Sequence, residues 1–214
     1  MSLFLTRAFV DFELAFKRGL RDSYRWHQAV WEAFPGRPEE KREFLTRLDV
    51  KDRGFQLLLL SASEPSKPDW APTDHWETKP IDAAFFNHER YSFQLRANPT
   101  KKLRVTLPDG SRKKNGRRQP LTAREELEQW IARKADGGGF AIDPAQVRIH
   151  PARKETFVKQ EESAGRLLGV IQGMEFRGTL EVRDRGKFIQ AFGTGIGPAK
   201  AFGYGMLALA PVNR

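Results

Sequence analysis

The sequence contains no cysteine among its 214 residues. This absence excludes disulfide bonds, thiolate metal ligands and a cysteine nucleophile, and it gives no indication of an oxidising compartment. Histidine is also scarce, and the four present are His27, His75, His88 and His150. No two of them form a metal-ligand motif, although scattered aspartates could still converge in the folded chain. The sequence therefore disfavours a metal-dependent active site, and we expect neither a bound metal nor a small-molecule cofactor.

Long apolar runs are missing as well. Runs such as residues 57–60 are far shorter than the roughly 20 residues of a membrane-spanning helix. The N-terminal segment 3–10 is too short for a secretory signal and is interrupted by Arg7. We therefore expect a cytoplasmic protein with no membrane partner.

Acidic residues are outnumbered by basic ones, 27 to 37, which gives a formal net charge of +10 and a pI near 10.0. A pI above about 9 is typical of nucleic-acid-binding proteins, although charge alone leaves open a basic protein without such a partner. Eight basic residues lie within positions 101–118, where Asp109 is the single acid. Such a run cannot be buried, so it forms either a solvated face or a phosphate-binding surface. The eight are Lys101, Lys102, Arg104, Arg112, Lys113, Lys114, Arg117 and Arg118.

The first part of the chain follows a strand–helix–strand–strand pattern. After a β-prone opening segment, an apolar stripe at helical spacing predicts a helix over 20–34, ended by Pro35-Gly36. Two strands are predicted over 44–50 and 55–61, and a weaker one over 75–81. The stripe consists of Leu20, Tyr24, His27, Trp31 and Phe34.

The second part repeats this order of elements. Thr122 and Glu125 predict a capping box at the start of a helix over 122–134, which residues 137–139 end. The other expected elements are strands over 90–97, 140–149, 167–182 and 204–210 and a short helix over 186–192. The simplest fold is α+β, with two tandem ferredoxin-like (RRM-like) βαββαβ domains over 1–88 and 89–214.

A glycine-rich segment spans residues 193–207. It contains Gly195-Ile196-Gly197 and Gly203-Tyr204-Gly205, separated by a five-residue spacer that carries Lys200. Glycine allows close backbone approach and positive φ, and exposed amides beside a lysine suit a phosphate-rich partner. An ordinary turn is the alternative. The apolar residues 206–210 that follow indicate a buried strand, which places the loop at the edge of a core.

The spacing of these glycines resembles the loop of the RAMP superfamily of CRISPR-associated RNA-processing proteins. Within that superfamily, residues 195–200 (GIGPAK) resemble the CasE (Cse-type) endoribonucleases of the type I-E Cascade complex. Further similar segments occur in the same order and extend the resemblance over essentially the whole chain. They are residues 24–31 (YRWHQAVW) with Phe34-Pro35, residues 93–99 (FQLRANP) and residues 207–211 (LALAP). The resemblance also implies the tandem ferredoxin-like architecture.

The resemblance implies an endoribonuclease that needs no metal or nucleotide. Such an enzyme binds the repeat stem-loop of precursor CRISPR RNA and cuts it by attack of the 2′-hydroxyl, leaving a 2′,3′-cyclic phosphate. Its partners are the CRISPR repeat RNA hairpin and, because the product stays bound, the other Cascade subunits. Two alternatives remain open, a non-catalytic RNA-binding or scaffold subunit on the same fold and a double-stranded nucleic-acid binder without hairpin preference.

The candidate catalytic residues lie on the first predicted helix. Tyr24 and His27 are three residues apart and so point to one side, although periodicity alone favours core positions for both. Metal-free RNA cleavage needs alignment of the 2′-oxygen, proton transfer and charge stabilisation. The resemblance implies that His27 is the general acid or base, that Tyr24 orients the ribose or phosphate, and that a lysine of the second domain stabilises charge. Lys154 and Lys159 are candidates for that lysine.

Further RNA contacts are expected from three regions. A hairpin of the second domain touches the RNA stem in the resembled family, and a mixed-charge loop is the equally weighted alternative for segment 148–166. His75, His88 and His150 are expected at the surface. Beside the eight residues of 101–118, the expected RNA-binding residues are Arg148, Arg153, Arg166, Gly195, Gly197, Lys200, Gly203 and Gly205.

Overall fold

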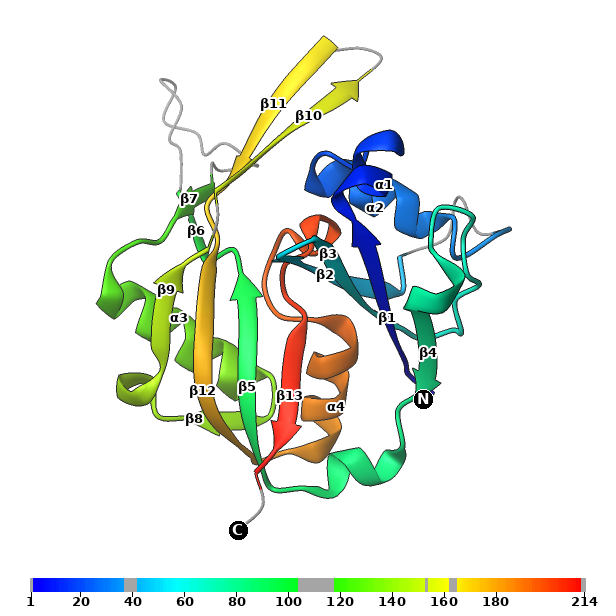
Figure 1. Cartoon of the computed structure of the whole chain (residues 1–214). Helices are drawn as coiled ribbons and strands as arrows, with labels where there is room; N and C mark the ends of the chain where they lie inside the picture. The colour runs from blue at the N-terminus through cyan, green and yellow to red at the C-terminus, as the bar shows by residue number, and fades with distance from the viewer. Residues whose placement is uncertain (1, 37–41, 104–117, 153, 162–164, 213–214) are drawn as a thin grey trace, which may run out of the picture.

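The computed structural model of the chain describes residues 2–36, 42–103, 118–152, 154–161 and 165–212. Two antiparallel sheets lie beside each other in this structure (Figure 1). The strands of one fall within residues 4–80 and those of the other within 90–211. The division into domains 1–88 and 89–214 remains our proposal.

The N-terminal sheet has the strand order β2-β3-β1-β4, which is that of a ferredoxin-like domain. A single 3₁₀ turn, η1, stands where the second helix of such a domain would lie. The elements are β1 (Phe4–Asp11), α1 (Phe12–Lys17), α2 (Ser23–Trp31), β2 (Phe44–Lys51), β3 (Gly54–Ser61), η1 (Thr73–His75) and β4 (Trp76–Pro80).

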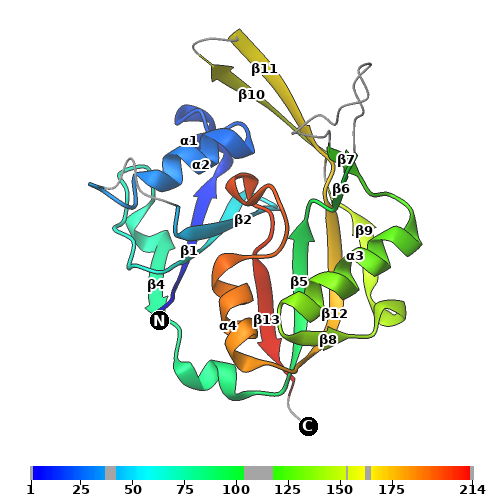
Figure 2. The same cartoon turned by 180° about the vertical axis from the view of Figure 1, so that it is seen from behind.

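The C-terminal sheet has the equivalent order β13-β5-β12-β8, and α3 and α4 cover one of its faces (Figure 2). Both halves of the chain are therefore ferredoxin-like, and the predicted α+β tandem fold is confirmed. The elements are η2 (Ala83–Asn87), β5 (Arg90–Ala97), α3 (Arg124–Gly137), β8 (Phe140–Ile142), β12 (Met174–Val182), α4 (Arg185–Thr194), η4 (Lys200–Phe202) and β13 (Leu207–Pro211).

Additional strands are inserted into the C-terminal half. The hairpin β10–β11 projects away from the sheet toward the side on which α1 and α2 lie (Figure 1), and β10 packs against α2. These insertions are β6 (Thr100–Lys102), β7 (Arg118–Pro120), η3 (Pro144–Gln146), β9 (Arg148–Pro151), β10 (Glu155–Glu161) and β11 (Gly165–Ile171).

The first predicted helix, over 20–34, is shorter in the structure and buries a different face. Asp22 caps α2 by accepting a hydrogen bond from the backbone amide of Arg25 at 2.9 Å, so the helix begins at Ser23. The buried residues of α2 are Trp26, Ala29 and Val30. Tyr24 and His27 are only half-buried, which leaves them accessible from one side.

The predicted capping box at Thr122 is wrong. Leu121 is buried, and its amide donates to the carbonyl of Pro99 at 3.0 Å, so the chain stays extended through Ala123. Helix α3 therefore begins at Arg124 with Ala123 at the N-cap position and no side-chain cap.

Two predicted strands are interrupted. Segment 140–149 is divided by η3, where Pro144 starts a turn and the Asp143 carboxylate accepts from the amide of Ala145. Segment 167–182 is divided near Gly173, whose backbone lies so close to Tyr204 that an added Cβ would meet that ring at 2.2 Å. The helix α1 was not expected at all. Its N-cap is Asp11, whose carboxylate accepts from the Leu14 amide at 2.7 Å.

A network of four charged residues joins the two sheets across their boundary. The guanidinium of Arg96 donates to Glu175 at 2.8 Å and to Asp49 at 2.7 Å, and Arg47 donates to Asp49 at 2.8 Å. Burial opposes ionisation of Asp49, but Arg47 and Arg96 outweigh it and hold the pKa of that carboxyl below its usual value. Arg47 and Glu175 are both buried residues. The network therefore fixes how the two sheets face each other.

In the part of the chain that the structure describes, no helix has the length and apolar character needed to cross a membrane.

Candidate active site

His27 lies on α2 among aromatic rings. The indole Nε1–H of Trp31 donates to His27 Nε2 at 3.3 Å, and the His27 and Phe44 ring centroids are 5.7 Å apart. Because Nε2 accepts this bond, the neutral ring carries its proton on Nδ1. That atom is buried and has no hydrogen-bond partner among the described residues. The ring is thus held in one orientation, with one nitrogen not yet engaged.

Two effects keep the His27 imidazole neutral. Burial, followed by the nearby charge of Arg42, lowers the pKa of His27 from 6.5 to about 4. The free protein therefore holds His27 at neutral pH in the form that accepts a proton. A bound phosphate would oppose the charge of Arg42 and raise this pKa.

The lowered pKa of His27 predicts an acid sensitivity of the fold. The unfolded chain binds a proton near pH 6.5 and the folded chain only near 4, so stability is fully present above 6.5 and is lost as pH falls from 6.5 toward 4. For this partly exposed ring we expect a loss of about 1–2 kcal/mol after solvent screening. Urea unfolding at pH 7.5 and 4.5 measures it. A His27→Asn variant should lose less stability over this range than the wild type, and equal losses would contradict the prediction.

Tyr24 precedes His27 by nearly one helical turn. Its hydroxyl accepts a hydrogen bond from Gln28 Nε2 at 3.4 Å, and the other end of that amide accepts from Arg25 Nη1 at 3.3 Å. The Gln28 amide thus orients the tyrosine hydroxyl beside an exposed guanidinium. A phenol held in this way can donate to a phosphate or ribose oxygen.

Arg42 and Lys200 bring positive charge to this site. Lys200 lies in η4, which packs against both α2 and β2, and its Nζ donates to the Thr194 carbonyl at 2.7 Å. Burial, then Arg42, then Lys134, lower the pKa of Lys200, and burial lowers the pKa of Arg42. The Arg42 Nε is buried without a hydrogen-bond partner in the described part of the chain. Two partly buried cations whose charges repel each other favour the binding of an anion near them.

Sequence reasoning included Lys200 but missed Arg42. Lys200 stands in a recognisable glycine-rich motif, whereas no motif surrounds Arg42. Only the folded chain brings the charge of Arg42 close enough to lower the pKa of both His27 and Lys200.

The glycine-rich loop connects the two halves of the chain at this point. Gly195 has φ of 77°, and a Cβ there would lie 2.8 Å from Leu45, the neighbour of Phe44 in β2. The amide of Ile196 donates to the Gly205 carbonyl at 2.8 Å, and the Gly205 amide donates to the Arg96 carbonyl at 2.7 Å. These two amides therefore hold the loop together in the free protein, and the RNA-binding role expected of the loop glycines remains a prediction.

The two candidate lysines of the second domain lie on or next to the projecting hairpin. Lys154 is exposed and lines a cleft of about 760 Å³ between the sheets, together with Ser23 and Trp26 of α2. Lys159 is in β10, where its backbone pairs with Leu167. Their catalytic role remains a prediction, and Arg42 and Lys200 supply the charge described around His27.

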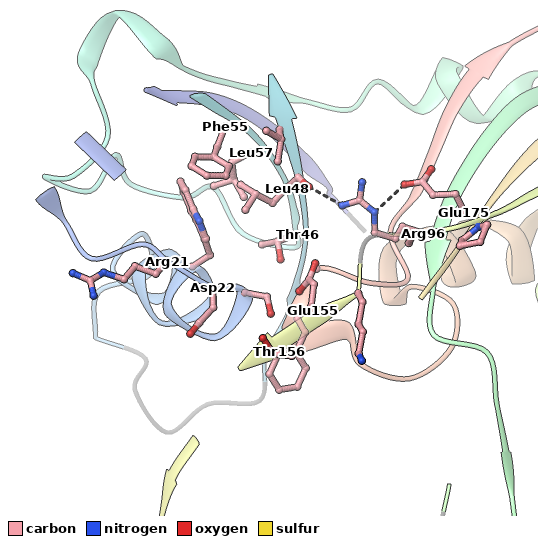
Figure 3. A pocket seen from close by; sticks show the side chains of 18 of the residues that line it. Arg21, Asp22, Thr46, Leu48, Phe55, Leu57, Arg96, Glu155, Thr156 and Glu175 are labelled. Carbon is pink, nitrogen blue, oxygen red and sulfur yellow. Dashed lines mark hydrogen bonds and ion pairs between the residues drawn. The ribbon is translucent and has the colours of Figure 1, made fainter. Parts of the chain in front are cut away.

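The cleft between the sheets differs in character from the site around His27. Arg96 and Glu175 face each other in it, and Asp22, Glu155 and Arg21 lie along its wall (Figure 3). Charges of both signs line it, so this cleft does not have the one-sided positive charge of a phosphate site.

The expected RNA-binding residues are distributed over several elements. Lys101, Lys102 and Arg118 share the small hairpin β6–β7, where Lys102 pairs with Arg118 across the strands. Arg148 is exposed on β9. Arg166 lies in β11. The remaining ones, Arg104, Arg112, Lys113, Lys114, Arg117 and Arg153, lie outside the described residues.

The other histidines are exposed, as expected, and His150 lies at the rim of the cleft between the sheets. Among the described residues, no group of three or more histidine, aspartate or glutamate side chains could hold a metal ion.

The fold and this site define a class of protein, a tandem ferredoxin-like chain in which a half-buried histidine and a basic glycine-rich loop meet at the boundary between two domains. The chain belongs to the CRISPR associated protein family, whose profile matches residues 3–211.

Two curated relatives are similar over nearly their whole length. One is the CRISPR-associated endoribonuclease Cse3 of Thermus thermophilus, 32% identical in an alignment 212 positions long that covers 92% of this chain and 94% of the relative. The other is the CRISPR system Cascade subunit CasE of Escherichia coli K12, 32% identical over 200 residues, 90% of this chain and 94% of the relative.

Solved structures agree with this similarity. Cas6e from Escherichia coli K-12 superposes with a TM-score of 0.74 at 28% identity, covering 98% of this chain and 100% of that one. Cse3 bound to a 19 nt RNA superposes with a TM-score of 0.73 at 26% identity, covering 99% and 100%.

Proposed function

We propose that this protein is an endoribonuclease that binds the repeat stem-loop of precursor CRISPR RNA and cleaves it without a metal ion. The observation that carries the proposal is the neutral His27 imidazole close to Arg42, with Lys200 beside that guanidinium, where α2 meets the glycine-rich loop. Two relatives at 32% identity support it, one named an endoribonuclease and the other a Cascade subunit. So does a similar Cse3 structure that carries an RNA representing a pre-cleavage complex.

The chemistry needs little from the protein beyond these groups. The 2′-oxygen attacks the adjacent phosphorus, its new bond to phosphorus forms as the bond to the 5′-oxygen breaks, and a 2′,3′-cyclic phosphate and a 5′-hydroxyl result. One proton moves in total from the 2′-oxygen to the 5′-oxygen, so no water is consumed. Neutral His27 accepts the 2′ proton at Nε2, where the proton replaces the hydrogen bond that the Trp31 indole donates to this atom in the free protein. Arg42 and Lys200 stabilise the charge that develops on the phosphate oxygens. Tyr24 orients the ribose or phosphate.

The partners follow from this reaction. The chain binds the repeat hairpin and keeps it as the end of the mature guide RNA, together with the other Cascade subunits. The strongly basic composition, +10 overall, supports tight retention of an RNA product.

The substrate itself tests the reaction type. A repeat RNA from the source organism should be cut once in the presence of EDTA, and an RNA with a single 2′-deoxy sugar at the cut site should bind but stay whole. The cyclic phosphate identifies the product. Cleavage of the deoxy RNA, or cleavage only after magnesium is restored, would overturn the metal-free mechanism. Tight binding without any cleavage would favour the scaffold alternative, and equal binding of unrelated duplexes would favour a binder without hairpin preference.

The role of His27 as base predicts a particular pH dependence. The pKa of His27 is about 4 in the free protein, so kcat/KM should be nearly constant between about pH 5.5 and 8. The whole of this range lies more than about one pH unit above that pKa. Single-turnover rates at saturating RNA should bend at a higher pH, since bound phosphate raises the pKa. If His27 acted as the acid, kcat/KM would instead rise about tenfold for each unit that the pH falls.

A further inference from the structure

A second cavity, of about 620 Å³, lies on the helical side of the C-terminal domain. Helices α3 and α4 and the start of the glycine-rich loop form its walls, and these helices stand side by side in Figure 2. We call it the α3–α4 groove. Five cationic residues and no carboxylate are among its described lining residues. The cations are Arg118, Arg133, Lys134, Lys187 and Lys200.

The charge of this groove is mostly uncompensated. In the described part of the chain, Arg133 and Lys134 have no carboxylate partner, and Lys187 has only Asp184, at 3.3 Å with both side chains exposed. Exposed pairs of that kind contribute little. Concentrated positive charge on concave protein surface attracts polyanions and is costly to keep without one.

The groove is not built to read bases. Its described lining contains no aromatic residue on which a base could stack. Trp130 lies next to Gly197, but its side chain is buried. Single-strand binders that hold bases use such rings, whereas lysine and arginine contact phosphates whatever the sequence. Lys134, whose Nζ lies 5.9 Å from the Trp130 ring centroid, is held at the groove by this contact.

The groove leads to the proposed active site. At one end of the groove, the charges of Arg42 and Lys134 add to the effect of burial in lowering the pKa of Lys200. The charge of Arg42 likewise adds to burial in lowering the pKa of His27. Arg118 connects the lining to the basic hairpin β6–β7. Because η4, which carries Lys200, packs against α2, one strand of RNA lying in the groove would lead toward the helix that carries His27.

We propose that the α3–α4 groove is a track for the phosphate backbone of the repeat RNA, with Arg133 and Lys187 as phosphate-binding residues that act independently of base sequence. This inference rests on the proposed function. It adds residues that no motif identifies, because Arg133 and Lys187 belong to different helices and meet only through their packing.

The test replaces Arg133 and Lys187 with glutamine in one variant and leaves the residues near His27 unchanged. The matched control is Arg7→Gln with Arg90→Gln, which removes the same charge from exposed positions outside the groove. Binding of the repeat RNA is measured between 50 and 300 mM salt, a range set by the steep salt dependence of phosphate contacts. The groove variant should bind about tenfold more weakly, and its slope of log K against log salt should fall by about 1.5.

Two further readouts separate the explanations. The affinity of the groove variant should fall by the same factor for an RNA whose stem base pairs are permuted. Its single-turnover cleavage rate at saturating RNA should stay within about threefold of the wild-type rate. Wild-type affinity and slope in the groove variant would refute the phosphate track, and so would an equal weakening of the groove variant and the control. Cleavage by the wild type would in either case preserve the proposed function. A loss confined to one stem sequence would also refute it, as would unchanged RNA binding with loss of assembly with the other Cascade subunits. A wild-type protein that neither binds nor cuts the repeat would instead refute the proposed function.

Discussion

Replacing His27 with alanine is expected to lower the single-turnover rate of repeat cleavage by about 10²–10⁴-fold, the range for removing a positioned general acid or base. Affinity for the RNA should change by less than about threefold, because the ring is surrounded by Trp31 and Phe44 and contributes no charge at neutral pH. The measurement is single-turnover cleavage beside a binding titration with the same RNA.

A size-conserving variant separates chemistry from packing. His27→Gln can keep a hydrogen bond to the Trp31 indole but cannot accept the 2′ proton at neutral pH, so we expect it to be as slow as the alanine variant. The exposed His88 provides the control, since His88→Ala should cut at the wild-type rate. If His27→Ala cut within about tenfold of the wild type, His27 would be no more than a packing residue and another group would carry the proton.

Replacing Glu175 with alanine is expected to reduce the free energy of unfolding by about 3 kcal/mol, within the range for breaking a buried ion pair from one side. Glu175 is the carboxylate that Arg96 contacts from the same sheet, while Asp49 is the one contributed by the other sheet. Without Glu175, the buried guanidinium of Arg47 and the partly buried guanidinium of Arg96 share a single carboxylate, that of Asp49. Urea unfolding at pH 7.5 measures the effect.

The same strand supplies a matched control for this prediction. Glu181 also lies in β12, but its partner Arg183 is 62% exposed and the pair faces solvent. Glu181→Ala should change the unfolding free energy by less than about 0.5 kcal/mol. Equal effects of the two substitutions would mean that the network between the sheets contributes no more than a surface ion pair. We also expect Glu175→Ala to lower cleavage, since η4 of one domain and α2 of the other must stay in contact.

Several features were predictable because they depend on neighbours in the sequence. Alternating apolar residues over 90–97 and the runs over 44–50 and 55–61 predicted three strands that the structure contains as β5, β2 and β3. The three-residue spacing of Tyr24 and His27 placed both on one side of a helix, and the paired Gly-x-Gly motifs predicted the loop of which Lys200 is part. Periodicity, turn residues and helical spacing are local properties, so a single sequence reveals them.

The exact ends of the helices and strands were harder to predict from the sequence. Whether Thr122 or Ala123 precedes α3 depends on the burial of Leu121, and whether 167–182 is one strand or two depends on the contact of Gly173 with Tyr204. Both contacts join residues whose proximity arises only in the folded chain. Local propensity cannot register them.

By itself, the sequence determined that the chain is a basic α+β protein with a repeated order of elements, a helix bearing Tyr24 and His27, and a glycine-rich loop bearing Lys200. Only the tertiary structure decided that Arg42 stands near that histidine, that Arg133 and Lys187 face one groove, and that Arg96 and Glu175 bind Asp49 across the boundary between the sheets. The reason is that each of these arrangements combines charges from segments far apart in the chain. The cost of leaving such charges unpaired, and the gain from pairing them, exist only where packing has removed the water between them.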